Sequence, residues 1–232
     1  MIKKDINQND ILNSELLNII DYNYIFDENP IKRIKTKPTL ENSKSRLKSL
    51  ENKIKAIENC NLKKNASKIV FSDGNIQSPI MIVGEGPGQK EDELGKPFVG
   101  DAGNLLNKML KAINIKRDKI YITNVVNYRP PNNRKPEPSE INRYSEFLKE
   151  HISIIDPKIL ILMGSTAMEA IIGSNKRISK ERGQWKEVII KQKNYKTIVT
   201  FHPAYLLRQP EQKKFSWKDL KIIRKEIDVL NI

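Results

Sequence analysis

Residues that could bind a ligand follow an apolar run in the first half of the chain. The run at 80–83 (IMIV) leads into the glycine-rich segment GEGPG at 84–88. Glycine lacks a Cβ atom, so the backbone here can approach a ligand closely and offer its N–H groups as donors. Glu85 and Glu91 supply carboxylates, and Phe98 supplies a flat ring face. This combination predicts a pocket that binds a planar ring.

A phosphate cradle for a nucleotide is the alternative use of a glycine-rich segment, and its spacing can be checked. A Walker loop needs Gly-Lys followed by Ser or Thr, but Gly95 and Lys96 are followed by Pro97. The dinucleotide fingerprint needs a third glycine where Gln89 stands. A protein that binds nucleotide phosphate through this segment is therefore the less favoured hypothesis.

Two further polar residues accompany apolar runs. Asn124 lies within the run at 120–126, and His202 directly follows the run at 198–201. The other histidine of the chain, His151, lies on a predicted helix, where we expect it to be solvated. Ligands in open parallel sheets bind beyond the carboxyl ends of the strands. We therefore expect the glycine-rich segment, Asn124 and His202 to meet at one edge of a sheet.

Apolar periodicity predicts strands that alternate with helices. The predicted strands lie at 80–83, 120–126, 159–163, 188–190 and 197–201. The predicted helices lie at about 45–57, 102–113, 139–154, 166–172 and 215–230. This alternation, with continuous apolar strands, predicts an α/β fold whose parallel sheet is covered by helices on both faces.

Composition limits the class of protein and its partners. The chain has 232 residues, 38% of them hydrophobic, which suits one substantial core. A formal net charge of +14 and a pI near 9.7 favour a polyanionic partner such as nucleic acid. Cys60 is the one cysteine, so an internal disulfide is excluded. No apolar run approaches the roughly 20 residues of a membrane span, and we expect a cytoplasmic protein without membrane contact.

Residues 1–50 differ in composition from the rest of the chain. They are rich in Asn, Lys and Ile, and Pro30 and Pro38 interrupt a polar stretch at 29–45. We expect an N-terminal extension over 1–50 that is partly disordered, followed by a domain over 51–232.

Six segments, read together and in order, resemble the family 4 uracil-DNA glycosylases. They are GEGPGQKED (84–92), GKPFVGDAG (95–103), TNVVNYRPPNNRKPEP (123–138), LILMGSTA (160–167), RGQW (182–185) and FHPAYLLRQP (201–210). The resemblance covers about residues 55–228 and implies a three-layer α/β/α sandwich with a central, mainly parallel sheet. It also implies a monofunctional enzyme of base-excision repair that hydrolyses the N-glycosidic bond of deoxyuridine in DNA and leaves an abasic site. The implied partner is uracil-containing DNA, single- or double-stranded, and we expect a monomer.

One departure concerns the four-iron, four-sulfur cluster that members of this family usually carry on four cysteines. Cys60 matches the second ligand position, whereas Ile57, Tyr128 and Tyr144 stand at the other three. One thiolate cannot hold a cluster that needs four ligands. We therefore expect no cofactor and no metal, with apolar and tyrosyl packing in the place of the cluster.

The resemblance implies roles for the uracil-binding residues. An enzyme must swing the nucleotide out of the duplex, and Phe98 then stacks on the flipped ring. The Asn124 amide accepts from uracil N3–H and donates to O4, a pattern that cytosine reverses. His202 and the backbone N–H groups of the glycine-rich turn stabilise the negative charge that develops at O2. The residues implied to bind uracil are Gly84, Glu85, Gly86, Phe98, Asn124 and His202.

Water must attack the opposite face of the sugar, and a carboxylate can orient it. Glu85 and Glu91 are both candidates, and the sequence leaves the choice between them open. Relatives that use an aspartate in this turn carry it at the position of Gly86, so this chain lacks that base. Asn133 is a further candidate for positioning the water or the sugar phosphate.

The segment 202–208 is implied to enter the duplex. Leu206 or Leu207 fills the gap that the flipped base leaves, and Arg208 contacts phosphate. The alternative to an enzyme is a catalytically inactive DNA-binding or scaffold protein on the same fold. The joint presence of Phe98, Asn124 and His202 argues against it.

Overall fold

The structure, a computed structural model, describes residues 39–232. The expectations for residues 1–38 lie outside the described part of the chain. The helix expected from about residue 45 begins earlier, because α2 (Leu40–Lys55) has Thr39 as its N-cap, with Thr39 Oγ1 accepting from Asn42 N at 3.3 Å. Leu50 of this helix is fully buried. The boundary expected after residue 50 therefore falls inside a helix of the compact domain.

A six-stranded sheet forms the centre of the domain, in the order β1-β3-β2-β4-β6-β5. The four inner strands are parallel, and the two edge strands pair antiparallel. The mainly parallel sheet is therefore confirmed, as is the α/β class. The strands are β1 (Asp73–Gly74), β2 (Ile80–Gly84), β3 (Tyr121–Asn124), β4 (Ile159–Met163), β5 (Trp185–Ile190) and β6 (Lys193–Thr200).

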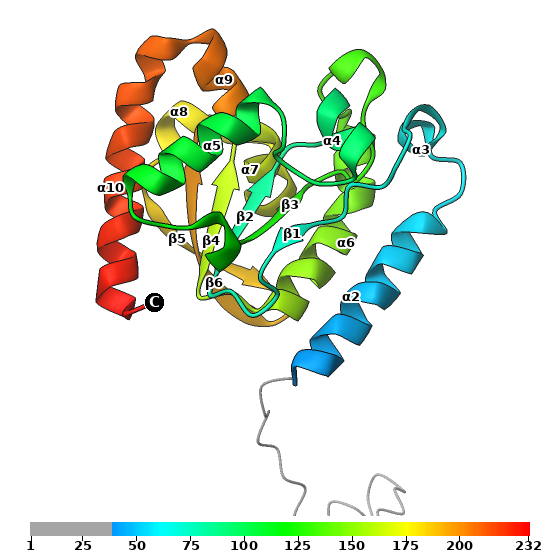
Figure 1. Ribbon diagram of the computed structural model, residues 1–232, viewed down its shortest axis with the longest axis horizontal. Coiled ribbons are helices and arrows are strands. Elements are labelled where there is room, and N and C mark those ends of the chain that lie inside the picture. The colour runs from blue at the N-terminus through cyan, green and yellow to red at the C-terminus, as the bar shows by residue number, and fades with distance from the viewer. Residues whose placement is uncertain (1–38) are drawn as a thin grey trace, which may run out of the picture. The chain divides into compact units, whose positions relative to one another are not determined.

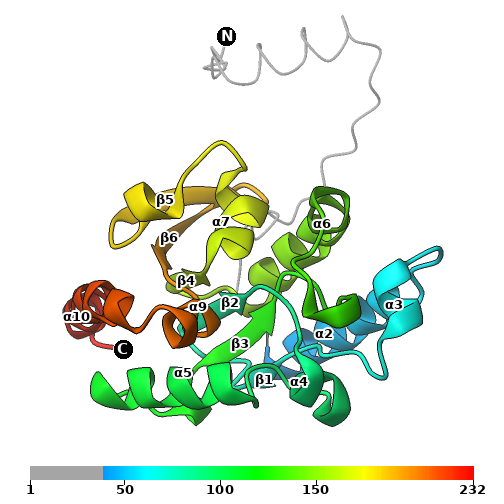
Figure 2. The same ribbon diagram turned by 90° about the horizontal axis from the view of Figure 1, so that it is seen from above.

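Helices cover both faces of the sheet, as Figures 1 and 2 show. One face packs against α2, α6 and α7, and the other against α5, α9 and α10. Successive side chains of a strand point to opposite faces, so Ile80 and Ile82 join one core while Met81 and Val83 join the other. Besides α2, the α-helices within residues 39–232 are α3 (Asn61–Asn65), α4 (Gln89–Leu94), α5 (Asp101–Ala112), α6 (Pro138–Ile155), α7 (Ser165–Ile172), α8 (Ile178–Glu181), α9 (Pro203–Arg208) and α10 (Lys213–Leu230).

The antiparallel pair β5 and β6 is joined by a two-residue turn. Both turn residues, Lys191 and Gln192, have positive φ, at 46° and 66°. Two such residues in succession match the twist of a tight hairpin. The strands predicted at 188–190 and 197–201 are longer than expected, because β5 begins at Trp185 and β6 begins at Lys193.

His151 is buried rather than solvated, so that expectation is wrong. It faces the sheet from α6, and its Nε2 lies 2.7 Å from the hydroxyl of Tyr121. The ring also stacks on Phe71, with 4.6 Å between ring centroids. Burial lowers the pKa of His151 to about 3, so the imidazole is neutral. Within residues 39–232, no helix is both long and apolar enough to cross a membrane.

Candidate active site

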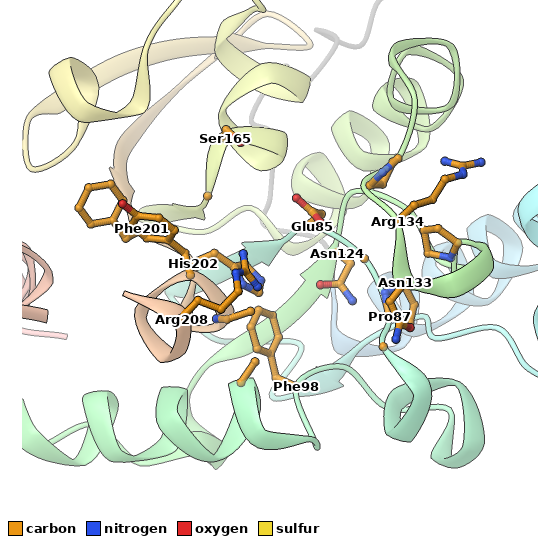
Figure 3. A pocket seen from close by; sticks show the side chains of 18 of the residues that line it. Glu85, Pro87, Phe98, Asn124, Asn133, Arg134, Ser165, Phe201, His202 and Arg208 are labelled. Carbon is orange, nitrogen blue, oxygen red and sulfur yellow. The ribbon is translucent and has the colours of Figure 1, made fainter. Parts of the chain in front are cut away.

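A cavity of about 650 Å³ lies at the carboxyl edge of the parallel strands. The strand register brings its walls together, because Gly84 at the end of β2 pairs with Asn124 at the end of β3. His202 follows the end of β6. Figure 3 shows Phe98, Asn124 and His202 facing the same space. The predicted site residues that line it are Glu85, Gly86, Glu91, Phe98, Asn124, Asn133, His202 and Arg208.

Gly84 lies behind the cavity rather than in its wall. A Cβ atom at this position would come within 2.4 Å of the Asn124 Oδ1 and 2.5 Å of the Phe98 ring. Only glycine therefore lets the amide and the ring lie side by side. Gly84 therefore sets the positions of two neighbours, and its contact with uracil stays a prediction.

The amide of Asn124 is held in place but leaves its hydrogen-bonding groups free. The residue is 3% exposed. Among residues 39–232, its side chain makes no hydrogen bond to another group. The amide nitrogen and oxygen are not fully enclosed by the protein, so both can bond to a ligand that enters the cavity. This geometry favours a ligand that presents one donor and one acceptor side by side.

Phe98 adopts a strained backbone conformation, with a φ of 54°. Arg117 donates hydrogen bonds to the carbonyl oxygens of Pro97 at 2.7 Å and Phe98 at 3.0 Å. Glu91 accepts from the amides that follow, Val99 N at 2.8 Å and Gly100 N at 2.7 Å. The two charged groups thus hold the peptide groups on both sides of Phe98. These contacts offset the strain that Phe98 carries because its backbone is in the left-handed region.

The contacts of Glu91 make it a poor candidate for orienting water. Its Oε1 is occupied by the two amides after Phe98, and its Oε2 accepts from Gly88 N at 3.2 Å. Both oxygens are therefore engaged by the backbone.

Glu85 retains the features that the water-orienting role requires. Its Oε2 accepts a hydrogen bond from the hydroxyl of Thr166, a fully buried residue of α7. Glu85 lines the cavity, where its second oxygen makes no other hydrogen bond with residues 39–232. The sequence offered no signal for the contribution of Thr166, because 81 residues separate the two partners.

His202 is arranged as a neutral hydrogen-bond donor. Its Nδ1 accepts from Ala204 N at 3.2 Å, which leaves the proton of the neutral ring on Nε2. Burial, with a smaller contribution from the positive charge of Arg208, lowers the pKa of His202 to about 4. Its ring centroid lies 5.4 Å from that of Phe98.

A buried ion pair secures the end of β6 just before His202. Arg182 Nε donates to Asp219 Oδ2 at 3.0 Å, and Thr200 Oγ1 donates to the same oxygen at 2.8 Å. The Arg182 guanidinium also lies over the ring of Phe201, 5.2 Å from its centroid. The RGQW segment therefore contributes to the site by positioning this strand end.

The backbone of the glycine-rich turn also offers donors to the cavity. In the described chain, the N–H groups of Glu85 and Gly86 donate no hydrogen bond, although Glu85 O accepts from Val126 N at 3.2 Å. Free N–H groups beside a neutral imidazole donor can stabilise an oxyanion.

Asn133 lines the cavity from a turn in which its φ is 54°. Its Oδ1 accepts from Arg129 Nε at 2.8 Å, which leaves the amide nitrogen available. Arg134, which the sequence did not single out, also lines the cavity and forms two 2.7 Å hydrogen bonds with Glu140.

Two adjacent leucines of helix α9 were candidates for entering the duplex, and the helix places their side chains in different environments. Leu206 is 1% exposed and packs in the core, so it cannot act as a wedge in this conformation. Leu207 is 43% exposed, and Arg208 lines the cavity. Only Leu207 has the exposure that insertion into DNA requires.

The positions that match the cluster ligands of the resembling family form part of the hydrophobic core. Cys60 Sγ lies 3.4 Å from the hydroxyl of Tyr144, and Ile57 and Tyr128 belong to the same core cluster. Among residues 39–232, no group of three or more His, Cys, Asp or Glu side chains is placed to hold a metal ion. These residues do not fit an iron–sulfur cluster.

Comparisons with known proteins show the family to which the chain is similar. A family model described as the uracil DNA glycosylase superfamily matches residues 71–223. A Type-4 uracil-DNA glycosylase of Thermotoga maritima is 42% identical over 157 residues, which span 67% of this chain and 80% of the relative. The protein of the same name from Sulfurisphaera tokodaii is 40% identical over 77% of this chain and 83% of its own length. That from Archaeoglobus fulgidus is 36% identical over 76% of this chain and 91% of its own length.

Proposed function

Because the chain belongs to the uracil DNA glycosylase superfamily, we propose that it excises uracil from DNA as a monofunctional hydrolase of base-excision repair. The observation that carries the proposal is that Phe98, Asn124 and His202 line the same cavity. These residues supply a stacking face, an amide with free groups and a neutral donor. A flipped uracil needs all three.

The recognition step uses the edge and the face of the base. Phe98 stacks on the flipped ring, which is worth about 1–3 kcal/mol but tolerates any base. Asn124 supplies the discrimination, because its acceptor faces N3–H and its donor faces O4 of uracil. Cytosine presents the reverse pattern and would leave buried groups unpaired.

The chemical step breaks the C1′–N1 bond, and the electron pair leaves with uracil. His202 Nε2–H and the free amides of the glycine-rich turn stabilise the charge at O2. Water adds to C1′ from the opposite face and transfers a proton to Glu85, the carboxylate that Thr166 orients. Asn133 helps position the water or the sugar phosphate. Leu207 fills the gap in the duplex, and Arg208 binds phosphate.

We further propose that this chain functions without the iron–sulfur cluster of its family, as a cytoplasmic monomer. The packing of Cys60 against Tyr144 supports the loss of the cluster. Anaerobically purified protein should contain no stoichiometric iron and show no brown absorbance. Stoichiometric iron would overturn this part of the proposal.

The excision activity is tested by incubating purified protein with labelled oligonucleotides and cleaving abasic sites with alkali. We expect product from U opposite G and none from T. Asn124→Ala should lower kcat/KM by about 5-fold to 150-fold, from the loss of two hydrogen bonds. His202→Ala should lower kcat by about 10²-fold to 10³-fold. Tight DNA binding without product would favour the inactive scaffold instead.

A further inference from the structure

One exposed face of α10 combines lysines with a tryptophan. Trp217 is 44% exposed, which is unusual for so large an apolar side chain. Exposed lysines lie on the same face of the helix, at Lys213, Lys214, Lys218, Lys221 and Lys225. Between residues 39 and 232, none of them forms an ion pair with an acidic side chain, whereas Arg224 of the same helix pairs with Asp228. These positive charges are available to an anionic partner.

A second cavity, of about 220 Å³, lies beside Trp217. Apolar side chains from α5, α9 and α10 form most of its wall, and Lys108 and Lys213 contribute from two of these helices. The apolar members of the wall are Leu105, Met109, Ala112, Leu206, Trp217 and Leu220. The groove therefore offers an apolar surface flanked by cations.

This surface continues directly from the proposed active site. Arg208, at the end of α9, lines the large cavity, and so does Gln212, the residue before α10. Leu206 lies in the wall of the small cavity. Figure 1 shows α9 at one end of α10, with α5 alongside. A DNA strand bound at Arg208 can thus continue onto Lys213 without leaving the protein.

We propose that the groove between α5 and α10 is a second DNA-binding site, which holds the strand beside the flipped nucleotide. This inference rests on the proposed function. Lysines bind the phosphates, and Trp217 stacks on a base or sugar over the apolar cavity. Charge complementarity selects DNA as the occupant, since a cationic rim around an apolar floor matches the phosphates and the bases of one strand. Because every base has an aromatic face, this contact does not depend on sequence.

Trp217 itself provides the probe. The chain has two tryptophans, so Trp185→Phe leaves Trp217 as the one indole emitter. Uracil-free DNA titrated into this variant should quench or shift the emission, with saturation at the concentration where DNA binding saturates. Trp217→Ala should weaken DNA binding by about 5-fold to 150-fold. Trp217→Phe keeps an aromatic face and should retain most of the affinity.

Salt dependence tests the lysines. Lys213→Gln and Lys218→Gln should each reduce the slope of log affinity against log salt by about 0.9 on duplex DNA. Lys191→Gln removes a charge at the distant β5–β6 turn and should leave the slope unchanged.

The outcomes separate this inference from the proposed function. Excision and DNA binding without any change in Trp217 emission would overturn the second site and leave the glycosylase assignment intact. Quenching of Trp217 with no excision by the wild-type protein would contradict the glycosylase assignment but support the DNA groove. If Lys191→Gln lowered the salt slope as much as Lys213→Gln does, the slope would report only the net charge of the protein, and the inference would be overturned.

Discussion

Arg117→Ala is expected to weaken excision by releasing Phe98, although Arg117 does not line the cavity. The guanidinium holds the carbonyl oxygens of Pro97 and Phe98 at 2.7 and 3.0 Å. Asp73 fixes the guanidinium in turn, through hydrogen bonds of 2.9 and 3.0 Å. In the variant, the hydrogen bonds of Glu91 and the core packing of the ring still restrain the segment, but the carbonyl groups on both sides of Phe98 lose their charged donor, which favours relaxation of its strained conformation.

The magnitude follows from these contacts. Hydrogen bonds from a charged donor contribute about 1.5–3 kcal/mol each, and the backbone strain at Phe98 costs about 1–3 kcal/mol. Removing two such bonds is therefore enough to let the strain relax. The ring then no longer stacks on uracil, at a loss of about 1–3 kcal/mol. We expect kcat/KM to fall by about 5-fold to 150-fold, mainly through KM.

A double-mutant cycle of excision rates distinguishes this effect from general destabilisation. The cycle compares the wild type, Arg117→Ala, Phe98→Ala and the double variant, at a temperature where all four are folded. Since Arg117 acts through Phe98, its replacement should have little further effect once Phe98 is alanine. Arg117→Lys keeps a positive charge near Asp73 but lacks the planar guanidinium. Its excision rate should lie between those of the wild type and Arg117→Ala. An equal loss in both Phe98 backgrounds would refute the reasoning.

Three further predictions follow from the same structure. Glu85→Gln should lower single-turnover kcat by about 10²-fold to 10⁴-fold with little change in KM, and an unchanged kcat would exclude Glu85 as the proton acceptor. Protonation of His151 favours the unfolded chain, because its pKa is about 3 when folded against 6.5 when unfolded; the free energy of unfolding should therefore fall as pH drops from 6.5 towards 3. Denaturant titrations should show a smaller fall in His151→Phe, and an identical fall would contradict the buried neutral state. Tyr144→Ala should destabilise the fold by about 3–5 kcal/mol, whereas Tyr144→Phe should cost less than about 1.5 kcal/mol, as thermal unfolding of both variants can show. A small effect of Tyr144→Ala would mean that the core around Cys60 is loosely packed.

The sequence was most informative where a strand is buried on both faces. The runs at 80–83 and 159–163 are continuously apolar, and β2 and β4 lie there almost to the residue. Once these strands are parallel neighbours, the residues after them must share one edge. This is why the meeting of Asn124 and His202 with the glycine-rich turn could be predicted without coordinates.

Side chains whose surroundings come from distant parts of the chain could not be predicted. His151 was expected in solvent because periodicity does not reveal that Tyr121 supplies its partner. The choice between Glu85 and Glu91 depends on which of them Thr166 and the backbone amides engage, and only the folded loops determine that. Likewise, the short helix α9 decides that Leu206 turns inward and Leu207 outward.

Direct detection of free uracil tests the central claim, that one cavity selects uracil and releases it as an anion. Purified protein and a duplex with one U:G pair are incubated under single-turnover conditions, and the released base is identified by mass spectrometry. The double variant Asn124→Ala/His202→Ala, purified in the same way, controls for a contaminating host enzyme. We predict one uracil per duplex from the wild-type protein and background release from the variant. Background release from both, despite bound DNA, would contradict the account.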